Sequence, residues 1–257
     1  MNKQQMIEIF TKEQRIEPVH SGWRREESEF VVRHVALFED HGFISFSQLM
    51  EDNAERVIEE ELRYFNNIGQ PFEWKLYDYD QPARLKQILE QKGFSVEEPE
   101  ALLILDIESQ ESLLNDSIPN TIKPITDNKG VDELIQLEND VWNTSHDSLG
   151  ERLKRDLIED PEHLHIYGAY EDGKLVSAAW MYLHKGTSFG SLWGGTTLPN
   201  YRKKGYYTSL LAIRAGQAWS KGYKLLTVDA SPMSSPILQK RGFELVAYSY
   251  PCMSPKR

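Results

Sequence analysis

The chain has 257 residues, of which 40% are hydrophobic and 27% charged, enough apolar content for a packed core and too much for long-range disorder. Asp and Glu outnumber Lys and Arg by 40 to 29, and the resulting net charge of −11 repels phosphate backbones, so nucleic acid is not an expected partner. The single cysteine, Cys252, excludes an intrachain disulfide and a multi-thiolate metal site.

Two observations bear on where the protein works. The longest aliphatic run, ALLIL at residues 101–105, is far shorter than the ~20 residues that a membrane helix needs. The first residues, MNKQQMIEIFTKEQ, lack the apolar centre and small-residue cleavage site of a secretory signal. We therefore expect a cytoplasmic protein that does not contact membranes.

The first half of the chain alternates strand-like and helix-like segments, judged by period-two and helical spacing of its apolar residues. The expected strands are 30–38, 43–46, 72–77 and 101–107, and the expected helices are 53–65 and 82–91. A polar stretch at 108–119 follows and is typical of a connection between domains.

The second half repeats this alternation, with a hairpin turn signal at Glu171-Asp172-Gly173. The expected helices are 131–142, 149–159, 206–220 and 234–240, and the expected strands are 163–170, 175–184, 189–197, 225–230 and 243–250. The order of elements indicates an α/β fold.

A short internal repeat links the two halves. The heptapeptide ILEQKGF at 88–94 is echoed by ILQKRGF at 237–243. Each copy follows a long helix, a glycine, a strand and a proline-marked loop in the same order. We therefore expect two related halves, residues 1–117 and residues 118–257.

The segment WGGTTLPNYRKKGYYT at 193–208 is the part of the sequence most informative about chemistry. It predicts a strand, a tight turn and a helix, with Arg202, Lys203 and Lys204 directly ahead of the first helical turn. Free N–H groups and the positive end of a helix dipole, together with three cations, suit a pyrophosphate. Gly205 would let the backbone approach the phosphates closely. The alternative is a solvated basic turn before an ordinary helix.

Residues 199–207, PNYRKKGYY, resemble the acetyl-CoA signature of the GCN5-related N-acetyltransferases (GNAT), whose core is Arg/Gln-x-x-Gly-x-Gly/Ala. Residues 238–243 resemble the last conserved block of that family, and the similarity covers roughly residues 122–250. The first half resembles a degenerate copy, with the Gly-Phe block but without an Arg-x-x-Gly counterpart. The resemblance implies an acyl-CoA N-acyltransferase fold, with a mixed central sheet flanked by helices.

The resemblance also implies an activity, the attack of an amine on acetyl-CoA, and a set of cofactor-binding residues. Backbone groups at the end of the strand would pair with pantetheine and stabilise the oxyanion, and the following loop would hold the pyrophosphate. The implied residues are Gly195, Thr196, Thr197, Arg202, Lys203, Lys204, Gly205, Tyr206, Tyr207, Thr208 and Ser231. The pair Gly194-Gly195 fits a β-bulge, or alternatively a closely packed position in the sheet.

Three positions depart from the pattern of the family. Tyr207 is bulky where the signature has Gly or Ala, and Ser231 stands where many members have Asn. Leu238 stands where a tyrosine often protonates the departing thiolate, and leucine cannot donate a proton.

Other residues must then handle protons. We expect Asp229, beside the thioester, to orient or deprotonate the amine, the alternative being a structural carboxylate that caps the turn at 231–234. Tyr248, Tyr250 and Cys252 are candidates for the leaving-group proton, and each is also explained by packing. Proton transfer through water is a further alternative.

The expected partner is a small-molecule or peptide amine. Four aromatic residues and the His146-Asp147 pair are candidates to line its site, and the same aromatic residues fit a core equally well. The aromatic candidates are Trp142, Trp180, Tyr182 and Trp193. We expect no metal, because His163 and His165 lack a third ligand. The N-terminal half is expected to shape the acceptor site or a homodimer contact.

Two other functions stay open. A non-catalytic acyl-CoA-binding protein is motivated by Leu238 and predicts binding of CoA without turnover. A tRNA-dependent aminoacyl-transferase also has tandem acetyltransferase-like halves. The acidic charge argues against that second function, because affinity for tRNA is built on phosphate contacts.

Overall fold

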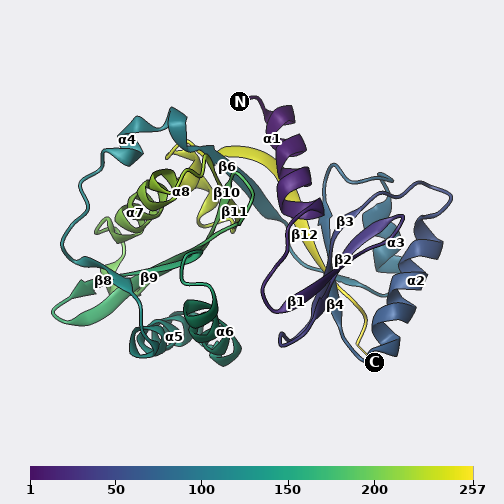
Figure 1. Cartoon of the computed structure of the whole chain (residues 1–257), viewed down its shortest axis with the longest axis horizontal. Coiled ribbons are helices and arrows are strands. Elements are labelled where there is room, and N and C mark those ends of the chain that lie inside the picture. Colours follow the sequence, from purple (N-terminus) through teal and green to yellow (C-terminus); the bar gives the residue numbers. More distant parts are fainter. Residues whose placement is uncertain (257) are drawn as a thin grey trace. The chain divides into compact units, whose positions relative to one another are not determined.

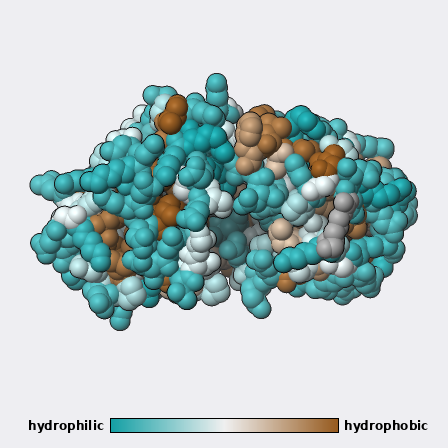
Figure 2. All heavy atoms as spheres, turned by 90° about the horizontal axis from the view of Figure 1, so that it is seen from below, coloured by the Kyte–Doolittle hydropathy of each residue, from teal (hydrophilic) through white to brown (hydrophobic). Residues whose placement is uncertain are grey.

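In the computed structural model, which describes residues 1–256, the chain divides by its internal contacts into two units (Figure 1). The first unit comprises Met1–Ile104 together with the described residues from Asp229 onward, and the second comprises Leu105–Val228. None of the helices among the described residues is long and apolar enough to cross a membrane. The face seen in Figure 2 is mostly hydrophilic and is broken by separate apolar patches.

The first unit is built on a mixed sheet. Its strands are β1(Trp23–Glu27), β2(Val31–Ala36), β3(Gly42–Ser47), β4(Phe72–Tyr77), β5(Ser95–Val96), β6(Glu100–Asp106) and β12(Glu244–Met253). Its helices are α1(Lys3–Phe10), the π-helix η1(Thr11–Ile16), α2(Ala54–Asn67), α3(Leu85–Gln91) and α8(Ser235–Gln239). The strand order is β1-β2-β3-β4-β12-β6, with β5 paired to β12, and only β3 and β4 run parallel. A core of buried side chains joins α2 and α3 to β4.

The strands of the second unit follow the order β11-β10-β9-β8-β7. Its strands are β7(Ile122–Ile125), β8(Leu164–Glu171), β9(Lys174–Leu183), β10(Phe189–Thr197) and β11(Leu225–Ala230). Its helices are η2(Ile107–Ser109), α4(Glu111–Leu114), α5(Asn128–Trp142), α6(Asp147–Glu159), η3(Pro199–Tyr201) and α7(Tyr206–Ser220). Only β10 and β11 run parallel.

Helices cover both faces of the sheet in the second unit. Ala178 and Trp180 of β9 pack with α5 and α6, whereas Ala179 packs with Leu210 of α7 on the other face. Figure 1 shows α5 and α6 on one side of β8 and β9 and α7 on the other. Alternate side chains of a strand point to opposite faces, so each face buries its own apolar set.

The same order of elements occurs twice. Three antiparallel strands, a long helix, a strand parallel to the third and a short helix make up β1-β2-β3-α2-β4-α3 and again β8-β9-β10-α7-β11-α8. The short helices are followed by Gly93 and Gly242 with φ of +88° and +91°, where the repeated Gly-Phe motif turns the chain. This is the arrangement that two related halves would produce.

The last strand, β12, belongs by sequence to the second half of the repeat but by its contacts to the first unit. β12 pairs with β4 and with β6, so residues from Asp229 onward belong to the first unit. The expected division into 1–117 and 118–257 describes the repeat in the sequence, and as a statement about domains it remains a proposal. All the helices and strands expected from the sequence have counterparts within a few residues.

Candidate functional site

A bulge interrupts β10 at its two adjacent glycines, in agreement with the first of the two interpretations of the sequence. The register of β10 against β9 shifts between Gly194 and Thr196, and Gly194 and Gly195 have φ of +70° and +92°. A Cβ on Gly194 would lie 2.4 Å from the Trp180 ring, and one on Gly195 would lie 2.7 Å from the Tyr207 ring. Both the backbone conformation and the space therefore require glycine.

Beyond the first residues of β10, one edge of the strand loses its partner. The pairing of β10 with β11 runs from Phe189 to Ser191, while β10 continues to Thr197. The Thr196 carbonyl accepts a hydrogen bond of 2.9 Å from Ser177 Oγ on β9. Because a trans peptide directs its N–H opposite to its carbonyl, the Thr197 N–H points away from β9, toward the edge that β11 has left.

The loop after β10 leads directly into an uncapped helix. Gly205, with φ of +88°, is the N-cap of α7, and none of the described side chains caps this end. The first N–H groups of an α-helix have no partner within the helix, so those of Tyr206, Tyr207 and Thr208 are donors at the positive end of its dipole.

The three cations of this loop differ in their contacts. Lys204 Nζ pairs with Glu171 on β8 at 3.0 and 3.2 Å, and the Tyr206 hydroxyl donates to the same carboxylate. Arg202 Nε donates to the Thr197 carbonyl at 3.2 Å, while Lys203 is exposed and has no polar partner in the described part of the chain. Lys203 and Arg202 are thus better placed than Lys204 to meet an anion.

A buried carboxylate that is not among the site residues expected from the sequence lies against the bulge. Glu138, on the inner face of α5, is 4% exposed, and its Oε2 accepts a hydrogen bond of 2.9 Å from Thr196 Oγ1. Its Oε1 is buried and has no hydrogen-bond partner within the described part of the chain, and burial raises the pKa of Glu138. The available signal was a charged residue on the apolar stripe of helix 131–142.

The four aromatic residues considered for an acceptor groove divide into two pairs. Trp180 is buried, and the half-buried Tyr182 donates to Asp156 Oδ2 at 2.8 Å. Trp142 and Trp193 are 54% and 46% exposed, with their indole N–H groups donated to Thr196 Oγ1 and Ser191 Oγ. The ring surfaces of Trp142 and Trp193 are therefore open to a ligand. His146 is tied to Asn139 Oδ1 through its backbone N–H and its ring Nδ1.

Asp229 and Ser231 belong to the first unit. Asp229 accepts a hydrogen bond of 3.0 Å from Ser249 Oγ. Desolvation of the carboxylate by the surrounding protein raises the pKa of Asp229, and the positive charge of Lys75 on β4 opposes that shift. Ser231 Oγ contacts Ser234 Oγ at 3.2 Å and accepts from its backbone N–H at 3.3 Å, so Ser231 caps the turn before α8.

The residues considered as proton donors to the thiolate lie in different surroundings. Leu238, which cannot donate and stands where the family often has the tyrosine donor, is 1% exposed within α8. Cys252 is buried in the core of the first unit, donates to the Tyr250 carbonyl at 3.3 Å, and burial raises its pKa to about 12. Tyr248 is exposed on β12. Among residues 1–256, no group of three or more His, Cys, Asp or Glu side chains is arranged to hold a metal ion.

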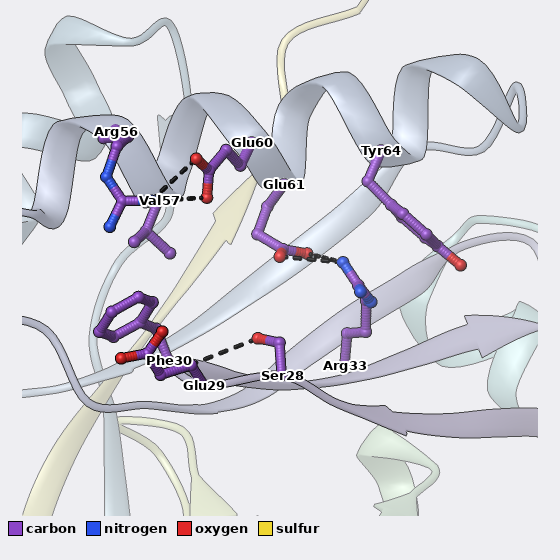
Figure 3. Close-up of a pocket in the computed structure, with 9 residues that line it drawn as sticks. All are labelled: Ser28, Glu29, Phe30, Arg33, Arg56, Val57, Glu60, Glu61 and Tyr64. Carbon is purple, nitrogen blue, oxygen red and sulfur yellow. Dashed lines mark hydrogen bonds and ion pairs between the residues drawn. The ribbon is translucent and has the colours of Figure 1, made fainter.

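A separate pocket of about 380 Å³ lies in the first unit, lined by α2 and the region of β2 (Figure 3). Arg33 faces Glu61 across it with two contacts of 2.9 Å, and its guanidinium also lies 3.8 Å from the centre of the Tyr64 ring. Arg56 pairs with Glu60. Because carboxylates already neutralise both guanidinium groups, this pocket presents no unpaired cation to an anionic ligand.

Residues 131–243 match the sequence profile of the Acetyltransferase (GNAT) family. No protein of curated function matches the sequence.

Three solved structures resemble nearly the whole chain. A GCN5-related N-acetyltransferase from Kribbella flavida is 15% identical, with a TM-score of 0.66, over 99% of this chain and 95% of that one. A conserved protein of unknown function from Staphylococcus epidermidis is 10% identical, with a TM-score of 0.67, over 98% and 100%. A tandem GNAT protein from the clavulanic acid biosynthesis pathway is 11% identical, with a TM-score of 0.63, over 99% and 96%. Residues 131–243 therefore match the GNAT acetyltransferase family, and the chain shares its fold along nearly its whole length with GNAT proteins.

Proposed function

We propose that the protein transfers an acetyl group from acetyl-CoA to an amine. Membership of the family supports acyl transfer in general. One observation carries the finer proposal: the open edge of β10 continues directly into the uncapped start of α7. An extended pantetheine would follow the strand edge, and the pyrophosphate would meet the helix.

The cofactor residues follow from this path. The backbone of Gly195, Thr196 and Thr197 would face pantetheine, and the loop and first turn of α7 would hold the phosphates. The proposed phosphate-binding residues are Arg202, Lys203, Lys204, Gly205, Tyr206, Tyr207 and Thr208. Lys204 would contribute least, because Glu171 already neutralises it. Ser231, which caps a turn, would also contact pantetheine.

The reaction needs an acceptor for a proton of the amine. As the nitrogen attacks the thioester carbon, the carbonyl oxygen gains charge. The C–S bond then breaks, and its electron pair leaves with sulfur. We propose Asp229 as the group that orients or deprotonates the amine. Glu138 is a second candidate, because a carboxyl group whose pKa is raised by burial is a stronger base than an ordinary one. With Leu238 unable to donate, the thiolate would take its proton from water.

The acceptor is proposed to be a small molecule or peptide with a primary amine. The exposed rings of Trp142 and Trp193, close to the Thr196 and Ser191 hydroxyls that their indoles bind, offer it apolar surface. A cationic amine would also be attracted to the faces of these rings before losing its proton.

A second candidate function is binding of acyl-CoA without turnover. The observation that favours it is the buried Leu238, because the protein then lacks the usual proton donor to the thiolate. This function shares the cofactor site and differs only in the chemistry that follows.

Thermal stability with and without acetyl-CoA tests the cofactor site. A ligand at ~100 times its dissociation constant adds ~2.7 kcal/mol, which raises Tm by several degrees in a protein of this size. We expect the shift in the wild type and its loss in Arg202→Ala/Gly205→Glu. The matched control is Lys221→Ala/Gly222→Glu at the other end of α7, because Gly222 has the same φ of +88° and equally open surroundings. A wild type without a shift, or a control that also loses it, would contradict the proposed site.

Release of CoA thiol with a panel of amines then separates the two candidate functions. The panel comprises amino acids, polyamines, aminoglycosides and lysine peptides. Thiol release that depends on an amine, with the acetylated product seen by mass spectrometry, supports the transferase. Tight binding of acetyl-CoA without release for any amine supports the binding protein.

A further inference from the structure

Arg214 is a buried cation on α7 that has no carboxylate partner among residues 1–256. Its side chain is 2% exposed, and its Nε donates to the Leu210 carbonyl at 2.9 Å. Its electrostatic neighbours are Tyr167 and Tyr207, and burial lowers the pKa of Arg214 to about 10, so it stays charged at neutral pH. Proteins seldom bury an arginine without pairing it, because desolvation of the charge is costly.

The contacts of Arg214 converge on the start of the bulge. Its Nη1 donates to the Trp180 carbonyl at 3.0 Å and to the Trp193 carbonyl at 3.2 Å. These two residues are cross-strand partners on β9 and β10. One nitrogen can reach both oxygens only if the Trp193 carbonyl points toward β9.

The orientation of this carbonyl determines where the next N–H points. In a planar trans peptide the N–H lies opposite to the carbonyl, so the Gly194 N–H points away from β9. That direction is the edge of β10 where pairing with β11 has ended at Ser191. Gly194 thus presents an N–H donor on the same edge as Thr197.

The charge of Arg214 also changes the strength of this donor. A cation hydrogen-bonded to a peptide oxygen draws electron density from the whole peptide group, which makes its N–H more positive. The effect is strong here because the guanidinium is buried and water does not screen it.

We propose that Arg214 is a positioning residue that orients and polarises the Trp193–Gly194 peptide, so that the Gly194 N–H stabilises the oxyanion formed on the thioester. This inference rests on the proposed function, because it needs an acyl-CoA on the open edge of β10. Attack by the amine nitrogen places an electron pair on the carbonyl oxygen, where the N–H holds it. The pair then re-forms the carbonyl as the C–S electrons leave with sulfur, and Arg214 gives up no proton in this cycle.

In a purely structural role, Arg214 would only hold α7 against the sheet through its hydrogen bonds to the Trp180 and Trp193 carbonyls. The two roles differ in a property of the bound cofactor, the infrared stretching frequency of its thioester carbonyl. A strong donor lowers this frequency, and the measurement requires no knowledge of the acceptor amine. The probe is acetyl-CoA isotopically labelled at the acetyl carbonyl.

We expect the wild type to lower this frequency relative to free acetyl-CoA, Arg214→Met to lose most of the shift, and Arg214→Lys to keep part of it. The affinity for acetyl-CoA should change less than about threefold, because the phosphate contacts are intact, while turnover falls about 10- to 100-fold. The matched control is Leu210→Ala, which loosens the same helix–sheet packing without removing the charge. It should lower Tm and leave the frequency unchanged.

Folded Arg214 variants that keep the wild-type frequency would overturn the proposal and leave Arg214 with a structural role alone. Should both variants fail to fold, the wild type still decides, because its Gly194 amide proton must move downfield in NMR spectra on addition of acetyl-CoA. An unmoved resonance would overturn the proposal. A wild type that binds no acetyl-CoA in the thermal assay refutes the proposed function itself, and this inference falls with it.

Discussion

Substitution of Gly195 by alanine tests the geometry of the bulge most sharply. Gly195 has φ of +92°, and a Cβ there would lie 2.7 Å from Cε2 of Tyr207. Two separate costs therefore arise, one from the backbone conformation and one from the overlap with an aromatic ring that is itself packed against the strand.

The two costs can be estimated separately. A left-handed backbone costs a residue with a Cβ roughly 1–2 kcal/mol. Overpacking of a filled site costs about 1–3 kcal/mol. The sum is about 2–5 kcal/mol, which corresponds to a fall in Tm of about 5–15 °C at this chain length.

Calorimetric unfolding of matched variants separates these contributions. Gly222→Ala carries the backbone cost alone, because Gly222 has φ of +88° and no atom within 4 Å of the added Cβ. Stiffening of the unfolded chain by alanine is common to both sites and cancels. Gly195→Ala should lose about 1–3 kcal/mol more than Gly222→Ala, and Tyr207→Ala should reduce this difference in the double variant. Equal losses at the two glycines would refute the contact between Tyr207 and the bulge.

Three further results are expected. Between the ordinary and the raised pKa of Glu138, the folded protein holds a proton that the unfolded chain has lost, so stability falls as pH rises through this window. Glu138→Gln should therefore raise Tm, relative to the wild type, more at about pH 8 than at about pH 4, and equal changes at both would contradict the assignment. Arg33→Met leaves the buried Glu61 carboxylate without its partner and should lower the free energy of unfolding in urea by about 3–5 kcal/mol. Arg33→Met/Glu61→Leu should restore most of this loss, and a loss that the double variant does not restore would contradict a buried ion pair. A fragment of residues 118–257 should not fold alone, because β12 loses both β4 and β6, and a cooperative thermal transition of this fragment would show otherwise.

Much of the fold follows from local patterns. The helices α2 and α5 carry apolar residues on one side, and the strands around them are short apolar runs bounded by turn residues. The strand β1 escapes such reasoning, because its sequence WRREE is charged. Charged residues are common on an edge strand, which pairs on one side only. The pairing of β12 with β4 joins residues far apart in the chain and has no local signature.

The candidate site also has a part that the local sequence encodes and a part that depends on how distant elements pack together. The bulge and the loop before α7 are encoded within residues 193–208, so their glycines and cations can be found from sequence. The approach of Glu138 to Thr196 depends on how α5 packs against β10, and the pairing of Lys204 with Glu171 depends on the neighbouring strand β8. Contacts of this kind arise only when the elements come together.

Hydrogen–deuterium exchange with and without acetyl-CoA tests the central claim most directly, because it locates the cofactor along the chain. The account predicts protection of residues 194–197 and 203–208 in the second unit. It predicts no change in residues 42–54 of the first unit, where the equivalent turn between β3 and α2 has neither the glycine bulge nor the cationic loop. Protection confined to the pocket between β2 and α2, or no protection anywhere, would contradict the assignment of the acyl-CoA site.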